Sequence, residues 1–356
     1  MSENSNRKVV LLKEKDIVSE WRIIRKLGEG GCGVVFEACS MGTPGSMWPR
    51  GRFAMKVESR FIDREEQLLH AEAAVLRRMH NSKHAPSLIT AGRTASFNFL
   101  LMELLGRSLN DLHKSAPERR FPLPIVLKIA MQSLAALREL HGVFFVHRDV
   151  KPGNFAVGLR EAGRIYIFDF GLSRQFVTLD KKEQKIRLRE PRVRAPFRGT
   201  VAYCSLNVHK HKEQGRHDDL LSMMYMLVEF VSGSLPWKGF HRKETAAVKE
   251  TISQRRLLQG CPKQFADIFD HLSVLDYRNR PDYDLIEGHF VSAMGKRGIN
   301  KDSPIEWNAV EMKESVGTNE KSETNAVADH DHTTVEDPTN FRHSNQHCKQ
   351  LTDAVA

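Results

Sequence analysis

One loop-like stretch constrains the fold of this 356-residue chain more than any other. Residues 147–154 read HRDVKPGN and lie between an apolar run at 143–146 and a short apolar stretch at 155–157. A basic residue, a carboxylate, a lysine, a proline and an asparagine are poor packing material for the buried strands that flank them. Because loops carry most binding and catalytic residues, we interpret this stretch as a chemically active loop held by a rigid scaffold.

Composition limits the class of protein. The chain is 40% hydrophobic, and no apolar run approaches the ~20 residues of a bilayer crossing. The polar start MSENSNRK lacks the apolar core of a secretory signal. Five scattered cysteines without CxxC pairing are typical of reduced thiols. We therefore expect a cytosolic or nuclear protein that does not associate with membranes.

Charge is distributed unevenly along the chain. Residues 313–356 hold four Lys/Arg against eight Asp/Glu, a net charge of −4. Because the whole chain carries +10, the rest of it carries +14. Such a basic body attracts nucleic acid, membrane headgroups or acidic proteins, and composition alone does not choose among them. The acidic tail after Met312 is low in apolar residues, which predicts disorder.

The first part of the chain has a strand-rich pattern. WRIIRKLGEG and GCGVVFEAC, from Trp21 onward, are apolar runs joined through glycines and predict a hairpin, and 53–58 predicts a third strand. Residues 40–52 are rich in Gly and Pro and predict a loop. Helical spacing over 65–78 predicts a helix, 97–105 predicts a buried strand, and Gly106 marks a hinge between two lobes.

The second part is predicted to be mainly helical. Residues 126–141 are strongly amphipathic, and 218–231 are apolar nearly all round, which is typical of a buried helix. We therefore predict a mobile segment at 1–20, a small lobe at 21–105, a large lobe at 106–312 and a disordered tail at 313–356.

Glycines at 28, 30 and 33 form GEGGCG between two predicted strands. Glycine lets a backbone approach phosphate oxygens closely and turn N–H groups toward them. Taken alone, a plain glycine-rich hairpin is the better interpretation. A dinucleotide-binding fold needs a helix directly after the glycines, and the strand-like VVFEAC argues against it.

Lys56 stands inside the apolar strand FAMKVE. A lysine on the inward face needs an acid or a phosphate as partner, and Glu72 on the next predicted helix is a candidate. From these residues alone, an outward-facing Lys56 and a solvated Glu72 remain open.

Asp149, Lys151 and Asn154 lie in the HRDVKPGN loop, and Asp169 lies in the stretch IYIFDFGL. A hairpin over 155–168 would bring Asn154 and Asp169 together. Asn and Asp supply the hard oxygen ligands that Mg²⁺ prefers. Asn154 and Asp169 therefore predict a magnesium site at the end of a strand.

In order and spacing, the glycine-rich loop, the strand lysine, the helix glutamate, HRDVKPGN and DFG resemble the protein kinase signature over residues 21–290. The segments LLGRSLNDL, KPGNFAVG, RGTVAYCSLNVH and RHDDLLSMMYMLVEFVSGSLPWKG resemble the casein kinase 1 superfamily, and GLSRQF, FRGTVAY and SPIEW are most similar to its tau-tubulin kinase branch. The resemblance implies an α+β, bilobal protein kinase fold and an ATP- and Mg²⁺-dependent protein serine/threonine kinase.

The resemblance also implies roles for particular residues. Asp149 would accept or orient the proton of a substrate hydroxyl, and Lys151 would place its charge on the transferring phosphoryl group. Asn154 and Asp169 would hold magnesium. The nucleotide would be bound by Leu27, Gly28, Gly30, Gly33, Val35, Ala54, Lys56, Glu72, Met102, Glu103 and Leu105. Asp219 would cap the backbone of the catalytic loop.

Substrate choice is predicted from a dense basic segment. Arg192, Arg194 and Arg198, with Thr200 and Arg216, would face protein substrates, and relatives of this kind favour acidic or phosphorylated ones. Cytoskeletal substrates follow only from the tau-tubulin kinase resemblance. A solvated loop neutralised by counterions remains the alternative. We expect a monomer that does not bind nucleic acid.

Some features depart from the family pattern. Cys32 stands at the tip of the glycine loop where a bulky residue is common, and the loop with Trp48 and Pro49 is long. Between Asp169 and Thr200 the only hydroxyls are Ser173 and Thr178, so we predict activity without phosphorylation of this segment.

Three alternatives stay open at this stage. A pseudokinase scaffold is disfavoured because the strand lysine and both aspartates are present. A nucleic-acid binder driven by the basic body lacks an aromatic-interleaved basic module. The histidines of the tail, with Cys348, have spacings that match no standard metal site.

Overall fold

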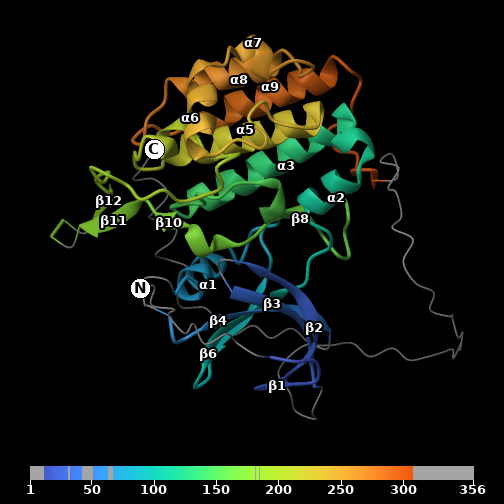
Figure 1. The fold of residues 1–356 in the computed structure, drawn as a ribbon, viewed down its shortest axis with the longest axis vertical. Coiled ribbons are helices and arrows are strands. Elements are labelled where there is room, and N and C mark those ends of the chain that lie inside the picture. The colour runs from blue at the N-terminus through green and yellow to red at the C-terminus, as the bar shows by residue number, and fades with distance from the viewer. Residues whose placement is uncertain are drawn as a thin grey trace, which may run out of the picture.

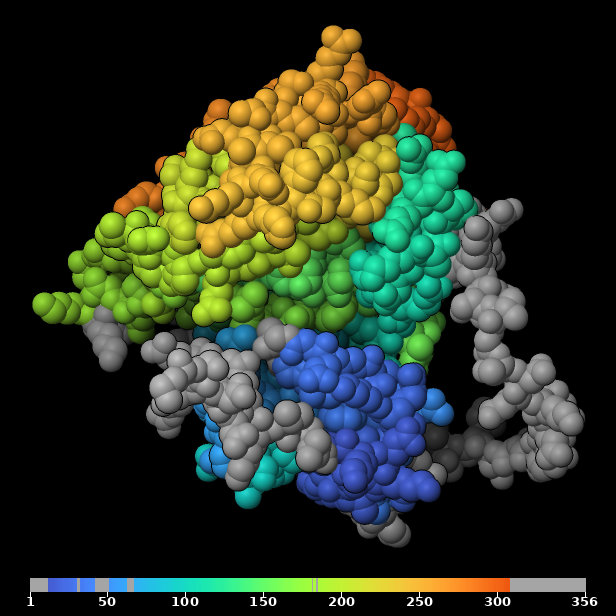
Figure 2. Space-filling model, viewed as in Figure 1, coloured from blue at the N-terminus to red at the C-terminus, as the bar shows by residue number. Residues whose placement is uncertain are grey.

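The computed structural model describes residues 12–30, 33–41, 51–62, 67–180, 182–183 and 185–307. They form a β-sheet lobe and a larger helical lobe, which Figure 1 shows one above the other. Figure 2 shows the same division as a smaller blue mass below a larger green-to-orange one. The predicted α+β bilobal arrangement is confirmed. Within the described residues, no helix has both the length and the apolar character needed to cross a membrane.

The small lobe is a six-stranded antiparallel sheet with the strand order β1-β2-β3-β4-β6-β5. Its strands are β1 (Ile17–Val18), β2 (Trp21–Gly30), β3 (Gly33–Ser40), β4 (Arg52–Ser59), β5 (Leu88–Arg93) and β6 (Phe97–Glu103). Trp21, Ile23 and Met55, each no more than 1% exposed, pack in its apolar cluster. The ring of Trp21 meets that of Phe53 edge-on at 5.3 Å. The predicted hairpin and third strand are therefore present.

Two strands of this sheet were not predicted. β1 lies inside the segment 1–20 that was expected to be mobile, where Val18 is buried and pairs with Trp21. A two-residue strand is too short to give a periodic signal. β5 has an irregular pattern, LITAGR, and its register with β6 shifts at Thr90. Such a bulge removes the alternation that identifies a strand in sequence.

One helix, α1 (Leu69–Arg78), packs against the sheet and the large lobe. Leu69, Val75 and Leu76 on one side are each no more than 3% exposed. The carboxylate of Glu58 accepts from the backbone N–H of Leu69 at 3.0 Å, which satisfies a donor that the first turn leaves unpaired. Glu65, the predicted start of the helix, lies outside the described residues.

Helices form most of the large lobe. The longer ones are α3 (Leu123–Gly142), α5 (Arg216–Ser232), α8 (Gln264–Ser273), α9 (Tyr283–Gly295) and α6 (Arg242–Thr251), and the shorter ones are α2 (Leu109–Ser115), α4 (Leu206–His209) and α7 (Gln254–Leu257). Single 3₁₀ turns span Pro117–Arg119 (η2), Pro152–Asn154 (η3) and Phe170–Leu172 (η4). The helices predicted at 126–141 and 218–231 correspond to α3 and α5.

Three short strand pairs complete the large lobe. β8 (Phe155–Val157) pairs with β9 (Ile165–Ile167), β7 (Phe145–Val146) pairs with β10 (Arg174–Gln175), and β11 (Val177–Asp180) pairs with β12 (Lys185–Leu188). Figure 1 shows β11 and β12 extending outward from the body of the lobe.

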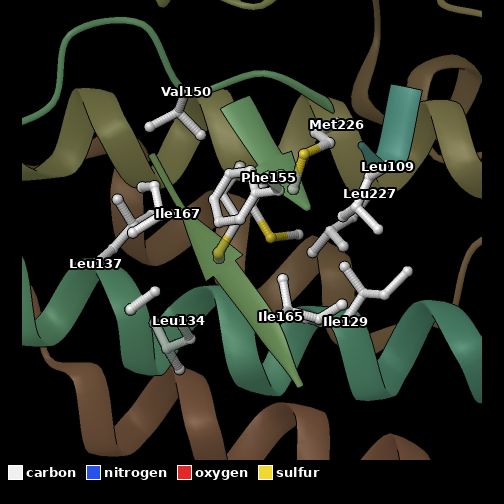
Figure 3. Close-up of a cluster of buried hydrophobic side chains, with 14 of the residues drawn as sticks. Leu109, Ile129, Leu134, Leu137, Val150, Phe155, Ile165, Ile167, Met226 and Leu227 are labelled. Carbon is white, nitrogen blue, oxygen red and sulfur yellow. The ribbon is translucent and has the colours of Figure 1, made fainter. Parts of the chain in front are cut away.

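The β8–β9 hairpin lies in the apolar centre of the large lobe. Figure 3 shows Phe155 and Ile167 pointing toward Leu134 and Leu137 of α3, with Met226 of α5 on the other side. All of these side chains are at most 2% exposed. Such close packing gives the loop before β8 and the segment after β9 a rigid base.

The chain passes from β6 to the large lobe at Gly106. The backbone N–H of Gly106 donates to the carbonyl of Val157 at 2.8 Å. A Cβ on this residue would lie 2.9 Å from Cγ2 of Val157 and 3.1 Å from its carbonyl oxygen, so the close approach requires glycine. The outer boundaries at 21 and 312 stay predictions, because residues 308–356 lie outside the described residues. The same holds for Cys32, Trp48, Pro49 and the histidines of the tail.

Candidate active site

Asp219, in the first turn of α5, fixes the backbone of the HRDVKPGN loop. Its carboxylate accepts from the backbone N–H groups of His147 at 2.6 Å and Arg148 at 2.9 Å, and from Nε2 of His141 at 2.9 Å. Burial would raise the pKa of Asp219, but the hydrogen bond and charge of His141 hold it below its ordinary value. Asp219 is therefore an ionised cap of the loop backbone, the role predicted for it.

Asp149 is the centre of a hydrogen-bonded group. Its carboxylate accepts from Nζ of Lys151 at 2.6 Å and from the hydroxyl of Thr200 at 2.7 Å. Nδ2 of Asn154 donates to the Asp149 carbonyl at 2.8 Å. Asp149 is 8% exposed and Asn154 is 4% exposed. The side chains of Asp149 and Lys151 thus point the same way, as their spacing predicts.

Gly199 brings Thr200 onto Asp149. It has φ +111°, a conformation that side chains with a Cβ rarely adopt. A Cβ there would lie 2.6 Å from the carbonyl oxygen of Arg148. The glycine of the GT pair is required by this close approach of two loops that lie far apart in the sequence.

Lys56 of β4 faces inward and joins the two lobes. Its Nζ lies 2.7 Å from Oε2 of Glu72 on α1 and 2.7 Å from Oδ1 of Asp169. The lysine side chain is 6% exposed and the glutamate 1%. The outward-facing alternative for Lys56 and the solvated alternative for Glu72 are therefore wrong. A residue from each lobe converges on one ammonium group.

The pKa values of Lys56, Glu72 and Asp169 are shifted in different directions by burial and by one another's charge. Burial would lower the pKa of Lys56, but the carboxylates of Glu72 and Asp169 raise it above its ordinary value. Burial raises the pKa of Glu72. Asp169 also loses solvent, yet the charge of Lys56 holds the pKa of Asp169 below its usual range. The ammonium therefore stays protonated beside an ionised Asp169.

Asn154 and Asp169 are brought together by the β8–β9 hairpin. The backbone N–H of Phe168 donates to the carbonyl of Asn154 at 3.0 Å. Asp169 itself adopts φ 63° and ψ 67°, a left-handed conformation that costs about 1 kcal/mol or more for a residue with a side chain. This backbone strain is typical of functional positions. Asp169 is the more accessible of the two, with a side chain 27% exposed.

These donors fit a magnesium ion. The amide nitrogen of Asn154 is bonded to Asp149, which leaves its oxygen as the donor atom, and Asp169 supplies a carboxylate. Among the described residues, no group of three or more His, Cys, Asp or Glu side chains could hold a metal ion. Magnesium is commonly held by one or two protein oxygens and completed by phosphate and water.

Several of the residues predicted to bind nucleotide lie on the strands of the small lobe. Gly28 pairs with Val35 in the β2–β3 ladder, and Val35 pairs with Lys56 in the next. A Cβ on Gly28 or Gly30 would meet no atom within 4 Å, so open space lies beside both. Gly33 has φ +113°, and a Cβ there would lie 2.2 Å from the carbonyl oxygen of Val57. The hairpin geometry therefore requires glycine at 33.

Ala54 and Met102, which the sequence predicts to contact adenine, lie on β4 and β6. Ala54 pairs with Met102, and both are 7% exposed. The side chain of Leu27 on β2 is more accessible, at 38%. The backbone N–H of Glu103 donates to the carbonyl of Ser87 at 2.9 Å, so this N–H does not contribute to binding a base. Leu105 follows β6 in the connection to the large lobe.

The five predicted substrate contacts separate into two groups. Arg194 and Arg198 are exposed, and Thr200 bonds Asp149. Arg192 instead forms two hydrogen bonds to Glu213, at 2.5 and 2.8 Å. Arg216 is 8% exposed and lies over the ring of Phe176 at 5.0 Å. Internal partners already engage both guanidinium groups, and the assignment of Arg192 and Arg216 to substrate stays a prediction.

Sequence reasoning missed several residues around the site. Glu213 and Lys249 are buried charges of the large lobe, and Tyr283 bonds Nδ1 of His141 at 2.7 Å. Each sits in a stretch whose pattern resembles an ordinary surface or helix face. Their partners lie 21 to 142 positions away, so no local signal identifies them.

The two-lobed fold and the clustered site together are those of a phosphotransferase. Residues 21–291 match the family model described as the protein kinase domain. The chain therefore belongs to the protein kinase family, whose members use ATP and Mg²⁺ in general.

Two relatives are similar in sequence to most of this chain. It is 33% identical over 294 residues to a protein of Dictyostelium discoideum named as a probable serine/threonine-protein kinase, covering 82% of this chain and 57% of the relative. It is 32% identical over 297 residues to the serine/threonine-protein kinase spe-6 of Caenorhabditis elegans, covering 81% of this chain and 75% of the relative. Both relatives belong by name to the serine/threonine class of these transferases.

Proposed function

We propose that this chain transfers the γ-phosphoryl group of Mg-ATP to serine or threonine hydroxyls of protein substrates. One observation carries the proposal: the carboxylate of Asp149 holds both the ammonium of Lys151 and the hydroxyl of Thr200 within 2.7 Å. Phosphoryl transfer depends on positioning and charge neutralisation more than on covalent chemistry. This cluster supplies a proton acceptor and a cation side by side.

Asp149 orients the substrate hydroxyl and accepts its proton. It is fixed by the loop cap from Asp219 and by the amide of Asn154, so its carboxylate is positioned before substrate arrives. Lys151 places its positive charge where the transferred phosphoryl group becomes more negative. The hydroxyl of Thr200 donates to the carboxylate and holds its orientation.

Lys56 binds the α- and β-phosphates, and Glu72 holds it in place. Asn154 and Asp169 hold magnesium, which when bound neutralises charge between the phosphates. The glycines at 28, 30 and 33 keep the β2–β3 turn close to the phosphates, and Val35, Ala54 and Met102 contact the base with Leu27, Glu103 and Leu105. The open space beside Gly28 and Gly30 supports this assignment.

We place the chain in the casein kinase 1 superfamily, next to the tau-tubulin kinase branch, on the segments RGTVAYCSLNVH and RHDDLLSMMYMLVEFV. Acidic or phosphorylated substrates fit the exposed guanidinium groups of Arg194 and Arg198, which lie in the same segment as Thr200. Cytoskeletal substrates remain a proposal from the branch alone. A peptide array with no preference for acidic or phosphorylated positions around the acceptor would exclude this selectivity.

The remaining assignments are also proposals. We infer a monomer that acts in the cytoplasm, with the nucleus as a second location, on protein substrates and without nucleic acid or membrane partners. Size-exclusion chromatography with light scattering and imaging of the tagged protein test these points separately.

The catalytic assignment is tested with radiolabelled ATP and casein. We expect incorporation by the wild type and loss of incorporation by Asp149→Asn and Lys56→Met. Lys301→Met and Asp302→Asn, both exposed and remote from the loop, are matched controls that should retain activity. Equal incorporation by all five proteins would defeat the assignment.

A further inference from the structure

Residues 211–214, between α4 and α5, lie along the segment 192–198 and bond to it repeatedly. The backbone N–H of Ala195 donates to the carbonyl of His211 at 2.8 Å, and the ring nitrogen Nδ1 of His211 lies 3.0 Å from the Ala195 carbonyl. Nε2 of Gln214 donates to the carbonyl of Arg198 at 3.1 Å. We call residues 211–214 the anchor segment, because they hold the chain that leads to Thr200.

The anchor segment contributes one buried carboxylate, Glu213. Its side chain is 2% exposed, and it receives Nε of Arg192 at 2.5 Å and Nη2 of the same residue at 2.8 Å. Nε of Arg174, in β10, lies 3.6 Å from Oε1, the oxygen that also accepts from Nη2 of Arg192. Burial would raise the pKa of Glu213, but the hydrogen bonds and charge of Arg192 hold it below its ordinary value. Glu213 is thus an ionised acceptor between two arginines.

A third arginine belongs to the same electrostatic group. Arg148, directly before Asp149, donates through Nε to the carbonyl of Leu172 at 2.7 Å. The pKa of Arg148 is lowered to about 10, first by burial and then by the positive charges of Arg174 and Arg192, while the negative charge of Glu213 acts to raise it. The carboxylate of Glu213 therefore contacts two guanidinium groups, from β10 and from the segment 192–198, and its charge also acts on that of Arg148. Without it, three partly buried cations would repel one another.

Glu213 and the arginines beside it are connected to Asp149 through neighbouring residues and hydrogen bonds. Gln214, next to Glu213, bonds the carbonyl of Arg198. Gly199 then packs against the Arg148 carbonyl, and Thr200 donates to Asp149 at 2.7 Å. Fixing Arg192 and Arg198 on the anchor segment therefore fixes the path of the chain into Thr200.

We propose that Glu213 is a positioning residue that replaces the phosphate by which many kinases order this segment. In those kinases, phosphorylation orders the segment by creating new pairs between arginines and the phosphate. Here a permanent carboxylate supplies the anion, so the segment is ordered in the unmodified chain. The inference rests on the proposed function. It accounts for the prediction that neither Ser173 nor Thr178, the two hydroxyls between Asp169 and Thr200, needs to be phosphorylated.

The test removes the anion and then restores it from solution. In Glu213→Ala, we expect kcat on a peptide substrate to fall on the order of 100-fold, as for a small misplacement of catalytic groups, while the KM for ATP stays unchanged. Millimolar inorganic phosphate should restore part of the lost rate, and potassium chloride at equal ionic strength should not. A residue with a purely structural role would not respond to phosphate.

Glu190→Ala is the matched control. Glu190 lies two positions before Arg192 and pairs with Arg278 at 2.6 Å, but its side chain is 78% exposed. We expect it to retain the wild-type rate and to show no response to phosphate. Glu213→Gln keeps the shape of the side chain and is the second variant if Glu213→Ala does not fold.

Hydrogen exchange provides a readout that does not depend on catalysis. The amides of Ala195 and of residues 197–200 should exchange faster in both Glu213 variants than in Glu190→Ala, and phosphate should slow them again. The proposal is overturned if either folded Glu213 variant matches Glu190→Ala in exchange and rate, or if phosphatase-treated wild type loses its activity. A wild type that incorporates no phosphate would defeat the proposed function instead, and exchange would still decide the role of Glu213.

Discussion

The carboxylate of Asp219 accepts the backbone N–H of His147 at 2.6 Å, across 72 positions of sequence. Asp219 is ionised, so the proton between it and Nε2 of His141 belongs to the histidine. Nδ1 of His141 is then the acceptor, and the hydroxyl of Tyr283 donates to it at 2.7 Å. The catalytic loop is therefore positioned by a buried chain of hydrogen bonds that begins on α9.

Asp219→Asn should destabilise the protein strongly. The Asn side chain accepts only through its oxygen, because its NH2 group is a donor. At least one of the three buried N–H groups that the carboxylate holds therefore loses its partner. We expect the free energy of unfolding to fall by about 3–5 kcal/mol, as when a buried charge pair is broken. Urea denaturation measures the change. Asp284→Asn, whose side chain is 78% exposed and pairs with Arg138, should shift it by less than about 1 kcal/mol.

The Asp219 effect should depend on pH. The folded-state pKa of this carboxyl is depressed, so its contribution is present above the ordinary pKa, about 4, and is lost as pH falls through the folded value. The difference in unfolding free energy between wild type and Asp219→Asn should therefore be constant near neutrality and shrink below about pH 4. A difference that grows on acidification would contradict this account.

Gly199→Ala should impair both activity and stability. The added Cβ would lie 2.6 Å from the Arg148 carbonyl in a residue with φ +111°, so Thr200 must move away from Asp149. We expect kcat to drop on the order of 100-fold, measured by peptide phosphorylation. Gly288→Ala in α9, where a Cβ meets nothing within 4 Å, should instead stabilise the protein by about 0.5–1 kcal/mol. Wild-type kinetics in Gly199→Ala would show that the close approach is unimportant.

Local signals were enough to locate much of this architecture. The glycine-separated strands β2 and β3, the helices α3 and α5, and the hairpin after Asn154 each carry a periodic pattern or a turn signal within a short window. The pairing of Lys56 with Glu72 was left open by the residues alone, because either orientation of an alternating strand is compatible with its sequence. Only the packing of α1 against the sheet decides it.

The rest could not be read from local sequence for a physical reason. β1 and β5 are too short or too irregular to show a period. Arg192 and Arg216 look like free surface charges, yet each meets its partner through the fold, Glu213 in one case and the ring of Phe176 in the other. Long-range pairing between charged or aromatic side chains leaves no mark in the neighbouring residues.

Glu72→Gln should reduce activity while leaving the fold intact. The amide still accepts from Lys56, but the loss of negative charge weakens the hold on the ammonium and lets it turn toward Asp169. We expect kcat/KM for ATP to fall on the order of 100-fold, measured in steady-state assays. Glu250→Gln breaks an exposed pair with Lys210 of the same 2.7 Å length and should leave it unchanged.

The Lys56 ammonium should not titrate in the working range. Its folded-state pKa is raised, so the stability it contributes is fully present below the ordinary lysine pKa and is lost only as pH rises through the higher folded value. Asp169, with a depressed pKa, stays ionised well into acid. The KM for ATP of the wild type should therefore show no inflection from this pair between about pH 6 and about pH 9. A lysine-like inflection in that range, absent from Glu72→Gln, would contradict the assignment.

Lys249→Met should loosen the segment that follows Thr200. Nζ of Lys249 donates to the carbonyls of Val201 at 2.9 Å and Cys204 at 2.6 Å, and it lies 5.0 Å from the ring centres of Tyr225 and Trp237. Two buried carbonyls lose a donor, so we expect the free energy of unfolding to fall by about 1–3 kcal/mol. The KM for a peptide substrate should rise while that for ATP is unchanged. Lys243→Met, exposed on the same helix, is the matched control.

The Lys249 effect carries a pH signature of its own. Burial lowers the pKa of Lys249 to about 8, whereas a lysine in the unfolded chain titrates near about 10.4. Between these values the unfolded chain binds a proton that the folded chain lacks, so the lysine makes the free energy of unfolding rise with pH. Wild type should therefore gain stability relative to Lys249→Met from about pH 8 to about pH 10. Buried Cys204 is common to both proteins, so its titration largely cancels in the comparison, and a constant difference across this range would exclude a depressed pKa for Lys249.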